Sequence, residues 1–352
     1  MMAEEPLLIW GGGAIGGTMA ASLARAGHPV LLVDIVADHV KACREAGLSI
    51  SGPIETFRLE IPSLTPDELS AQHPNARFSR IILAVKAQAT ELALGQLAPF
   101  LSPDGFVFSA QNGLNEIAIS RRIGVGRTMG CFVNFGADWL GPGEILYGNR
   151  GAMVLGELDG KIRERTQAMH RLLSVFEPDA VVTDNIWGYL WGKLAYGAML
   201  FATALTIDSM AENFRDPRRE IVFARLGREV MAVALARGVT PIGFPEFDID
   251  AFRPGMQAGR MQAAIAALAD YTSKTAKTHT GIYRDLAVRK RKTEVDPQIG
   301  IISTLAAEAG IATPAITHLV ALIHEIEDGK ALMHFETFNR LILTCQTASK
   351  AE

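Results

Sequence analysis

Cysteine is scarce in this sequence, and its three residues, Cys43, Cys131 and Cys345, lie far apart. They fit neither a disulfide framework nor a cysteine-ligated metal site, and such usage is typical of proteins in a reducing cytosol. The eight histidines include no i, i+4 pair with carboxylate support, so we expect no metal site. The sequence has no G-x-S-x-G motif or Cys/His pair, which argues against nucleophilic hydrolysis.

Long apolar runs and an excess of basic charge are also missing. The apolar run over residues 194–205 contains Gly, Tyr and Thr and is too short to cross a bilayer. The N-terminal MMAEEPLL has no basic stretch ahead of a long apolar one, unlike a signal peptide. A net charge of -4 gives no electrostatic reason to expect nucleic acid or an anionic membrane as partner. We therefore expect a cytoplasmic protein.

The pattern of the chain changes near its middle. Up to about residue 182, short β-rich runs alternate with helical segments, which is typical of βαβ units and a parallel sheet. The runs MGCFVNFG and GAMVLGE look like two further strands that pair antiparallel around a Gly-rich turn, DWLGPGE. The expected early elements are strands at residues 7–10, 30–34, 81–85 and 106–110 and a helix at residues 13–26.

The second half of the chain is almost wholly helical in period. Breaks occur at GVTPIGFPEFD, DAFRPG and GIATP. A chain of 352 residues is too long for one ordinary core, so we predict two domains. The predicted boundary separates an α/β domain, residues 1–183, from an all-α domain, residues 184–352.

The most specific motif lies in LLIWGGGAIGG, where glycines in a G-x-G-x-x-G pattern follow a strand and open a helix. Such a turn directs backbone N–H groups and a helix N-terminus toward a pyrophosphate. A second strand follows and ends at Asp34, 18 residues past Gly16, which is the order of a Rossmann-type dinucleotide site. The alternative is a Gly-rich turn without a ligand. The predicted cofactor-binding residues of the turn are Gly11, Gly13, Ala14, Ile15 and Gly16.

Asp34 bears on which dinucleotide binds. A carboxylate at the end of the second strand can accept hydrogen bonds from the adenosine ribose, and it repels a 2′-phosphate. The residue therefore favours NAD(H) over NADP(H). Lys41 and Arg44 follow as candidate phosphate partners, although a solvated helix face explains them equally well. An FAD site on the same fold has no other support in the sequence.

Two further polar residues follow expected strands. Lys86, in VKAQ, and Asn112, in QNG, come after apolar runs, and the carboxyl ends of such strands are where open α/β sheets bind ligands. Lys86 suits a cofactor phosphate or ribose, and the Asn112 amide suits a nicotinamide or a catalytic ammonium. A polar residue that merely faces water at a strand end is the alternative for each.

Lys193 is the unusual residue of the helical half. It lies in WGKLAYGAML, a run that otherwise looks like a helix core. An ammonium in apolar surroundings becomes a proton donor usable near neutral pH, which suits protonation of the alkoxide formed when a carbonyl is reduced. The alternative is a lysine whose chain extends from a core helix to solvent.

RKRKTEVD, residues 289–296, is the second unusual segment. Its four cations most simply form a solvated surface, and help in holding an acidic substrate ranks second. Glu294 is either a functional carboxylate or part of a helix start, because Thr293 and Asp296 have the T-x-x-D spacing. His279, in KTHTGIYRD, is expected at an ordinary polar helix position.

Together these segments resemble the 2-dehydropantoate 2-reductase (ketopantoate reductase) family. The order GGGAIGG, AVKAQ, QNGLNE, WGKLAYG, RKRKTEVD and GIATP follows the motif order of that family across nearly the whole chain. The resemblance implies a Rossmann-type domain followed by an all-α domain like the C-terminal domain of 6-phosphogluconate dehydrogenase. It also implies NAD(P)H-dependent reduction of a 2-oxo acid, with NADP(H) as the usual cofactor.

By motif match, the resemblance gives residue roles. Lys193 becomes the general acid and Glu294 the carboxylate that engages the substrate hydroxyl. Asn112 lies on the nicotinamide side of the site and Lys86 contacts the cofactor. A helical second domain often supplies a dimer surface, so a homodimer is a further expectation.

The sequence departs from the family pattern in its substrate-binding positions. The family usually has asparagines four and eight residues after the lysine, where this chain has Gly197 and Phe201, and a serine where it has Gly281. Ketopantoate is the substrate that the resemblance implies, and a more apolar 2-oxo acid or an opine-like compound is the alternative. The predicted substrate-binding residues are Gly197, as a substrate-facing position, and His279, Thr280 and Arg284, which are candidates to bind the substrate carboxylate. A dinucleotide-binding sensor without turnover is disfavoured, because it needs neither Lys193 nor Glu294.

Overall fold

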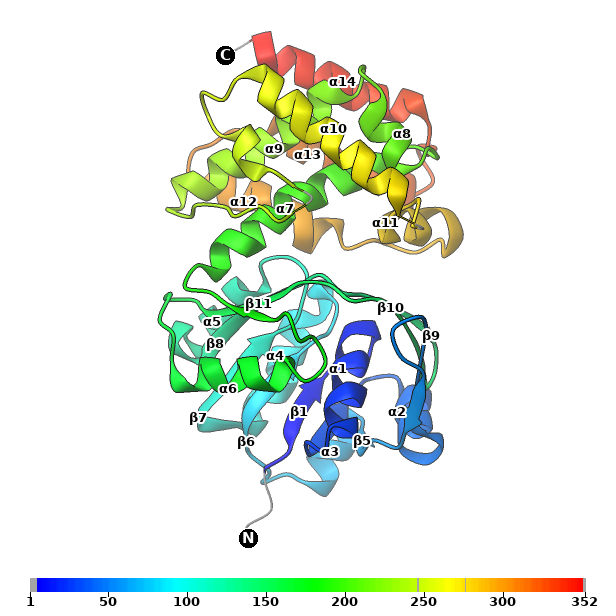
Figure 1. Cartoon of the computed structure of the whole chain (residues 1–352), viewed down its shortest axis with the longest axis vertical. Helices are drawn as coiled ribbons and strands as arrows, with labels where there is room; N and C mark the ends of the chain where they lie inside the picture. Colours follow the sequence, from blue (N-terminus) through cyan, green and yellow to red (C-terminus); the bar gives the residue numbers. More distant parts are fainter. Residues whose placement is uncertain (1–4, 246, 276, 351–352) are drawn as a thin grey trace. The chain divides into compact units, whose positions relative to one another are not determined.

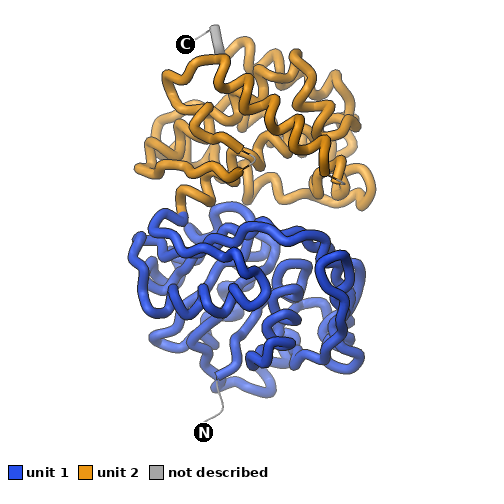
Figure 2. The backbone as a smooth tube through the Cα atoms, viewed as in Figure 1, with its two compact units in different colours: residues 1–186 blue, residues 187–352 orange. Residues whose placement is uncertain are grey.

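The chain forms two compact units, residues 1–186 and 187–352 (Figure 2). The computed structural model describes residues 5–245, 247–275 and 277–350. The predicted boundary between residues 183 and 184 lies just before α7, Ile186–Thr203. Among the described residues, no helix combines the length and the apolar composition that a membrane crossing requires.

The first unit is built on an eight-stranded sheet with the order β12-β11-β8-β7-β6-β1-β2-β5 (Figure 1). Neighbouring strands run parallel except β8 and β11, which pair antiparallel as predicted for MGCFVNFG and GAMVLGE. The order β5-β2-β1-β6-β7-β8 is that of a Rossmann fold, and it reverses direction between β1 and β6. The four predicted early strands are confirmed. The strands are β1 (Leu7–Trp10), β2 (Val30–Val33), β5 (Ser63–Leu64), β6 (Phe78–Leu83), β7 (Leu101–Ser109), β8 (Thr128–Val133), β11 (Met153–Glu157) and β12 (Val181–Val182).

Both faces of this sheet are buried. Side chains along each strand alternate between the two faces, so each strand contributes to two cores. Leu7 and Ile9 of β1 belong to a core that includes apolar residues of α1 and α6, whereas Leu8 and Trp10 belong to a core with residues of α3, α4 and α5. Burial on both sides explains why these strands are continuously apolar in the sequence. The helices of the unit are α1 (Ala14–Arg25), α2 (Ala37–Ala42), α3 (Pro66–Gln72), α4 (Thr90–Leu97), α5 (Asn115–Ile123) and α6 (Glu164–Leu173).

A second, four-stranded sheet with the order β4-β3-β10-β9 was not predicted. The segment expected to be only a turn, DWLGPGE, instead ends β9 and starts β10, which pair antiparallel as a hairpin. The strand signal is weak because most β9 residues are at least partly exposed and show no apolar alternation. The strands are β3 (Leu48–Ser51), β4 (Phe57–Leu59), β9 (Gly136–Gly141) and β10 (Glu144–Asn149).

The second unit is helical, as predicted, and α9 lies at its centre. This helix packs against α10, α12, α13 and α14, and its buried residues include Phe223, Leu226 and Val230. The predicted breaks fall between helices, at the loop after α9, before α10 and before α13. The remaining helices are α8 (Met210–Arg215), α9 (Glu220–Ala236), α10 (Ala258–Lys274), α11 (Gly281–Tyr283), α12 (Ile301–Glu308), α13 (Pro314–Glu327) and α14 (Phe335–Lys350).

Candidate functional site

The glycine turn after β1 lies at the point where the sheet order reverses. Gly11 has φ +105°, and a Cβ there would lie 2.7 Å from the backbone nitrogen of Val85 in the loop after β6. A Cβ at Gly16 would lie 2.0 Å from the Gly11 carbonyl oxygen. Both positions therefore require glycine, since any side chain would separate the turn from its neighbours. The turn and the β6 loop meet at the edge where Rossmann folds bind dinucleotides.

The N-terminus of α1 fits a pyrophosphate group. Gly13 is its N-cap, no side chain caps the helix, and the first turn, which contains Ala14 and Ile15, has no acidic residue. A Cβ at Gly13 would meet no heavy atom within 4 Å, so the space beside the cap is open. Backbone N–H groups and the positive end of the helix dipole there favour an anion.

Asp34 follows β2 and binds the same turn. Its Oδ2 accepts a hydrogen bond from Gly12 N at 2.6 Å, and its Oδ1 accepts one from Val36 N at 2.8 Å. Each carboxylate oxygen has a second lone pair for a ribose hydroxyl. Arg44, a candidate phosphate partner, instead donates to Ser63 O at 3.4 Å and to Glu68 Oε1 at 3.3 Å.

Lys86 and Asn112 occupy the loops after β6 and β7. These strands are parallel neighbours, with Leu83 paired to Ser109 at their carboxyl ends. The two loops therefore leave the same edge of the sheet as the glycine turn, as the sequence predicted. Lys86 and Asn112 are both exposed.

A chain of buried hydrogen bonds joins the two loops. Gln111 Nε2 donates to Val85 O at 2.9 Å and to Thr90 Oγ1 at 2.8 Å. Thr90 Oγ1 donates to Asn115 Oδ1 at 2.9 Å, and Asn115 Nδ2 donates to Asn112 O at 2.7 Å. The chain thus runs from the backbone just before Lys86 to the backbone of Asn112. Sequence reasoning missed it, because its members are separated along the chain and belong to no single motif.

Lys193 lies on the part of α7 that the core does not cover. Lys193, Tyr196, Gly197 and Leu200 are all partly exposed, whereas the residues between and beside them, including Phe201, are buried. Their i, i+3, i+4, i+7 spacing places the four on one face of the helix. We call this face the lysine stripe. It presents one cation among apolar groups, and a Cβ at Gly197 would meet no heavy atom within 4 Å.

The predicted substrate residues near Gly281 lie at the start of α11. Thr280 is buried and caps this helix, since its Oγ1 accepts a hydrogen bond from Tyr283 N at 3.0 Å. The prediction of a helical position for His279 is wrong: the residue lies in the preceding loop, where its Nε2 is 3.1 Å from Ile207 O. Arg284 follows α11 and is partly exposed. A Cβ at Gly281 would meet open space.

The basic run at residues 289–292 is exposed, which confirms a solvated surface. Two of its members pair with a nearly buried carboxylate, because Asp285 Oδ1 lies 3.0 Å from Arg289 Nη1 and 2.9 Å from Arg291 Nη2. The Asp285 carboxylate therefore neutralises part of the positive charge of this run.

Glu294 is partly exposed and precedes a π-helical turn, Asp296–Gly300. Thr293 Oγ1 accepts a hydrogen bond from Val295 N at 3.2 Å and donates to Glu327 Oε1 at 2.7 Å. The predicted helix start, in which Thr293 would pair with Asp296, is therefore not formed; Thr293 instead caps the backbone N–H of Val295, two residues further on. Glu327 on α13 anchors the residue beside Glu294.

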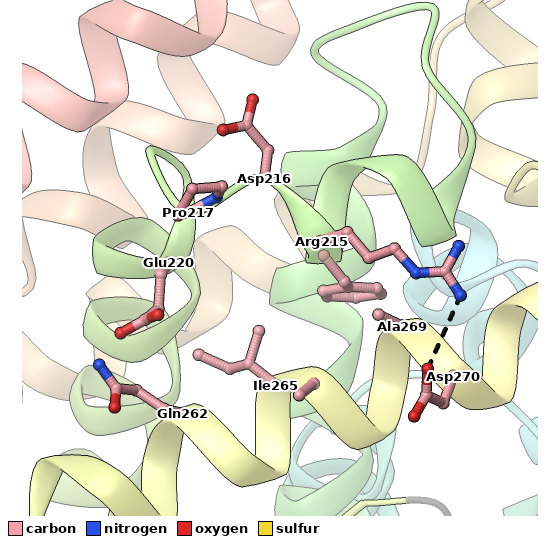
Figure 3. Close-up of a pocket in the computed structure, with 10 residues that line it drawn as sticks. Arg215, Asp216, Pro217, Glu220, Gln262, Ile265, Ala269 and Asp270 are labelled. Carbon is pink, nitrogen blue, oxygen red and sulfur yellow. Dashed lines mark ion pairs between the residues drawn. The ribbon is translucent and has the colours of Figure 1, made fainter.

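A hollow in the helical unit lies between α8, α9 and α10 (Figure 3). The Arg215 guanidinium lies 3.7 Å from Asp270 Oδ1 at one end of it, and Glu220 and Gln262 lie at the other (Figure 3). None of the predicted site residues lines this hollow. It is therefore separate from the lysine stripe.

Comparisons with known proteins extend over most of the chain. The family described as ketopantoate reductase PanE/ApbA matches residues 7–160, and its C-terminal counterpart matches residues 185–327. A 2-dehydropantoate 2-reductase from Mesorhizobium japonicum is 26% identical over 347 residues, which cover 91% of this chain and 97% of that protein.

Solved structures show the same fold. One is D-mandelate dehydrogenase in a ternary structure with NADH and anilino(oxo)acetate, which is 23% identical with a TM-score of 0.79 over 92% of this chain and 99% of that one. Another is a PanE/ApbA family ketopantoate reductase from Ralstonia eutropha, which is 24% identical with a TM-score of 0.74 over 92% and 99%. The chain belongs to the ketopantoate reductase family and is an NAD(P)-dependent oxidoreductase that acts on CH–OH groups.

Proposed function

We propose that the protein reduces a 2-oxo acid with an apolar side chain to the 2-hydroxy acid, with Lys193 as the proton donor. The lysine stripe carries this proposal, because it offers a single ammonium on an otherwise apolar, partly exposed helix face. Bound NAD(P)H supplies a hydride to the carbonyl carbon. Lys193 Nζ donates a proton to the developing alkoxide oxygen, and Glu294 engages the hydroxyl group that this step forms.

The apolar side chain of the substrate follows from what replaces the family's asparagines. Gly197 leaves open space one turn after Lys193, and Phe201 turns the next position into buried core. Tyr196 and Leu200 flank the gap, and Tyr196 packs against Phe244 at 5.5 Å between ring centroids. A larger, less polar group than that of ketopantoate fits such a surface, since it needs room and few hydrogen bonds.

Ketopantoate is the second candidate. The Mesorhizobium japonicum relative, named 2-dehydropantoate 2-reductase, aligns with 91% of this chain and supports it. The two candidates differ in one polar group, because ketopantoate carries a hydroxyl group that needs a hydrogen-bond partner on the lysine stripe. Burial of a substrate hydroxyl without a partner costs about 1–3 kcal/mol, so the polar substrate should be the poorer one here.

Steady-state kinetics on a panel of 2-oxo acids tests the proposal. We expect kcat/KM to be at least about tenfold higher for phenylglyoxylate or 4-methyl-2-oxopentanoate than for ketopantoate, which corresponds to about 1.4 kcal/mol. A preference for ketopantoate would favour the second candidate. No turnover of any 2-oxo acid, with NADH bound normally, would favour a sensor.

Lys193→Ala tests the proton donor. We expect kcat to fall about 100-fold or more, with the Kd of the dinucleotide unchanged. Lys274→Ala, at the exposed end of α10, is the matched control and should keep full activity. A Lys193→Ala enzyme with wild-type kcat would remove the lysine from the mechanism.

The predicted homodimer and cytoplasmic location stay predictions.

A further inference from the structure

The second glycine of GGGAIGG, Gly12, is held on both sides of its backbone. Its N–H donates to Asp34 Oδ2 at 2.6 Å, and its carbonyl oxygen lies 2.8 Å from Nε2 of His39 on α2. The His39 side chain is almost completely buried, with 1% exposed. A residue outside the G-x-G-x-x-G motif therefore contacts the centre of the dinucleotide turn.

The imidazole also explains why position 12 is glycine. The motif leaves this position open, yet a Cβ at Gly12 would lie 3.0 Å from His39 Nε2 and 3.2 Å from its Cδ2. Such a contact is too close for a side chain to fit without a shift of the ring. Gly12 and His39 thus fit each other.

The other ring nitrogen fixes the tautomer. Gly143 N donates to His39 Nδ1 at 2.9 Å, so the hydrogen of the neutral ring is on Nε2 and is donated to Gly12 O. Gly143 lies in the turn between β9 and β10 with φ +74°, and its carbonyl accepts a hydrogen bond from Ser49 N at 2.8 Å. His39 therefore bridges the hairpin and the dinucleotide turn.

The hairpin touches the turn region at two more points. A Cβ at Gly17, in the first turns of α1, would lie 2.3 Å from Ile145 Cδ1 of β10. The ring of Trp139 on β9 packs edge-on against His39, with 6.2 Å between ring centroids. The hairpin is thus seated on α1 and on His39 together.

The direction of the Gly12 carbonyl determines the direction of the next N–H group. In a trans peptide the C=O of one residue and the N–H of the next point opposite ways. No peptide bond among the described residues is cis, so a Gly12 carbonyl aimed at buried His39 aims Gly13 N–H away from it. A Cβ at Gly13 would meet no heavy atom within 4 Å, so this residue borders open space that a pyrophosphate could fill.

We propose that His39 is a positioning residue for dinucleotide binding. It holds the Gly12–Gly13 peptide in the orientation that presents N–H groups to the pyrophosphate, and it takes its own position from the β9–β10 hairpin through Gly143. The inference concerns binding of NADH or NADPH and is independent of the 2-oxo acid.

Three substitutions separate the two bonds of the ring. His39→Gln places an amide nitrogen near Nε2 and keeps the bond to Gly12. His39→Asn places an amide oxygen near Nδ1 and keeps only the bond to Gly143, and His39→Leu removes both. We expect the Kd of NADH, measured by nicotinamide fluorescence, to rise about tenfold in the Asn and Leu variants, which lose the bond to Gly12. The Gln variant keeps this bond, and its Kd should rise less than about threefold. A tenfold change in Kd corresponds to about 1.4 kcal/mol.

His170 provides the matched control. It lies on α6 of the same unit, and its Nε2 is 2.7 Å from the backbone oxygen of Ala180. His170→Asn and His170→Leu should lower the melting temperature and leave the Kd of NADH unchanged. The KM of the 2-oxo acid should be unchanged in every His39 variant.

A structural role alone would lower stability equally in the Asn and Gln variants and leave both Kd values at the wild-type level. That result would overturn the proposal, as would equal weakening of NADH binding in the Asn and Gln variants. If His39→Leu does not fold, the Asn–Gln pair decides, since both keep an amide at position 39 and differ in which of the two bonds they retain.

Discussion

A Cβ atom on Gly192 would lie 1.9 Å from the carbonyl oxygen of Ile242. The loop after α9 crosses α7 at this point, and Ile242 N donates to Gly188 O at 2.9 Å. Two glycines one turn apart thus let a backbone segment lie directly on the helix. Gly192 is the residue before Lys193, so this contact also holds the start of the lysine stripe.

Gly192→Ala should therefore destabilise the protein, although alanine favours helices. Overpacking of a tight site typically costs about 1–3 kcal/mol, and urea unfolding measures it. Gly197→Ala is the control on the same helix: its Cβ meets open space, and it should gain about 0.5–1 kcal/mol. Equal effects of the two substitutions would mean that the loop does not lie on α7 as described.

The Gln111–Thr90–Asn115 chain makes a second prediction. Thr90→Val keeps the shape of the side chain and removes the hydroxyl that joins Gln111 to Asn115. The loops of Lys86 and Asn112 are then joined only by the bond from Gln111 to Val85 O. We expect the Kd of NADH to rise and kcat/KM to fall, each about tenfold, since one buried hydrogen bond contributes about 1 kcal/mol or more. Fluorescence titration and initial rates measure the two values.

Controls for this prediction come from serine and from a second buried threonine. Thr90→Ser retains the hydroxyl and should restore most of the activity. Thr128→Val removes a buried hydroxyl that donates to Gly124 O at 3.0 Å, far from any predicted site residue in sequence, and should affect stability alone. If Thr90→Val and Thr128→Val behave alike, the chain has no role in positioning the loops.

The sequence predicted the parts of the site that local patterns encode. The strand–turn–helix of residues 7–26 and the position of Asp34 follow from apolar runs and glycine spacing, which act over a few residues. The lysine in WGKLAYGAML was visible because a cation in an apolar run is costly and therefore unusual. Such features need no knowledge of distant contacts.

The unpredicted parts depend on contacts between distant residues. Gly143 and His39 are 104 positions apart, and no local pattern indicates that one donates a hydrogen bond to the other. The β9–β10 hairpin was read as a turn because its glycines are conspicuous and its strands lack apolar alternation. The position of His279 was wrong for a related reason, since Thr280 starts a new helix directly after it.

Asp34 makes a prediction about cofactor choice. A carboxylate at the end of the second strand of a Rossmann fold repels a 2′-phosphate. Arg44 is engaged by Ser63 and Glu68. We expect the wild type to bind NADH at least about tenfold more tightly than NADPH, or about 1.4 kcal/mol. Asp34→Ala should reduce this ratio, although both Kd values rise because Gly12 N–H loses its acceptor. A wild type that prefers NADPH would show this view of Asp34 to be wrong.

Glu116 makes a prediction about pH. Its side chain on α5 is fully buried, and a Cβ at Gly130 of β8 would lie 3.6 Å from its Oε1. In the part of the chain that the structure describes, neither carboxylate oxygen has a hydrogen-bond partner of normal geometry. Burial raises the pKa of Glu116 from 4.5 to about 7, because the charged form loses its hydration.

A raised carboxyl pKa means that the folded state holds the proton more tightly than the unfolded state. Its contribution to stability is thus present at acid pH and is lost as the pH rises from about 4.5 to about 7. Glu116→Gln removes the ionisation, so urea unfolding should show a gain over wild type that is about 2 kcal/mol larger at pH 8 than at pH 5. Glu68→Gln is the control of opposite sign, because the backbone N–H of Thr65 lowers the pKa of the partly exposed Glu68. Its loss of stability should be small, and it should be largest at neutral and alkaline pH and fade on acidification. A Glu116→Gln effect that is constant from pH 5 to pH 8 would show that the carboxyl is charged in the folded protein throughout.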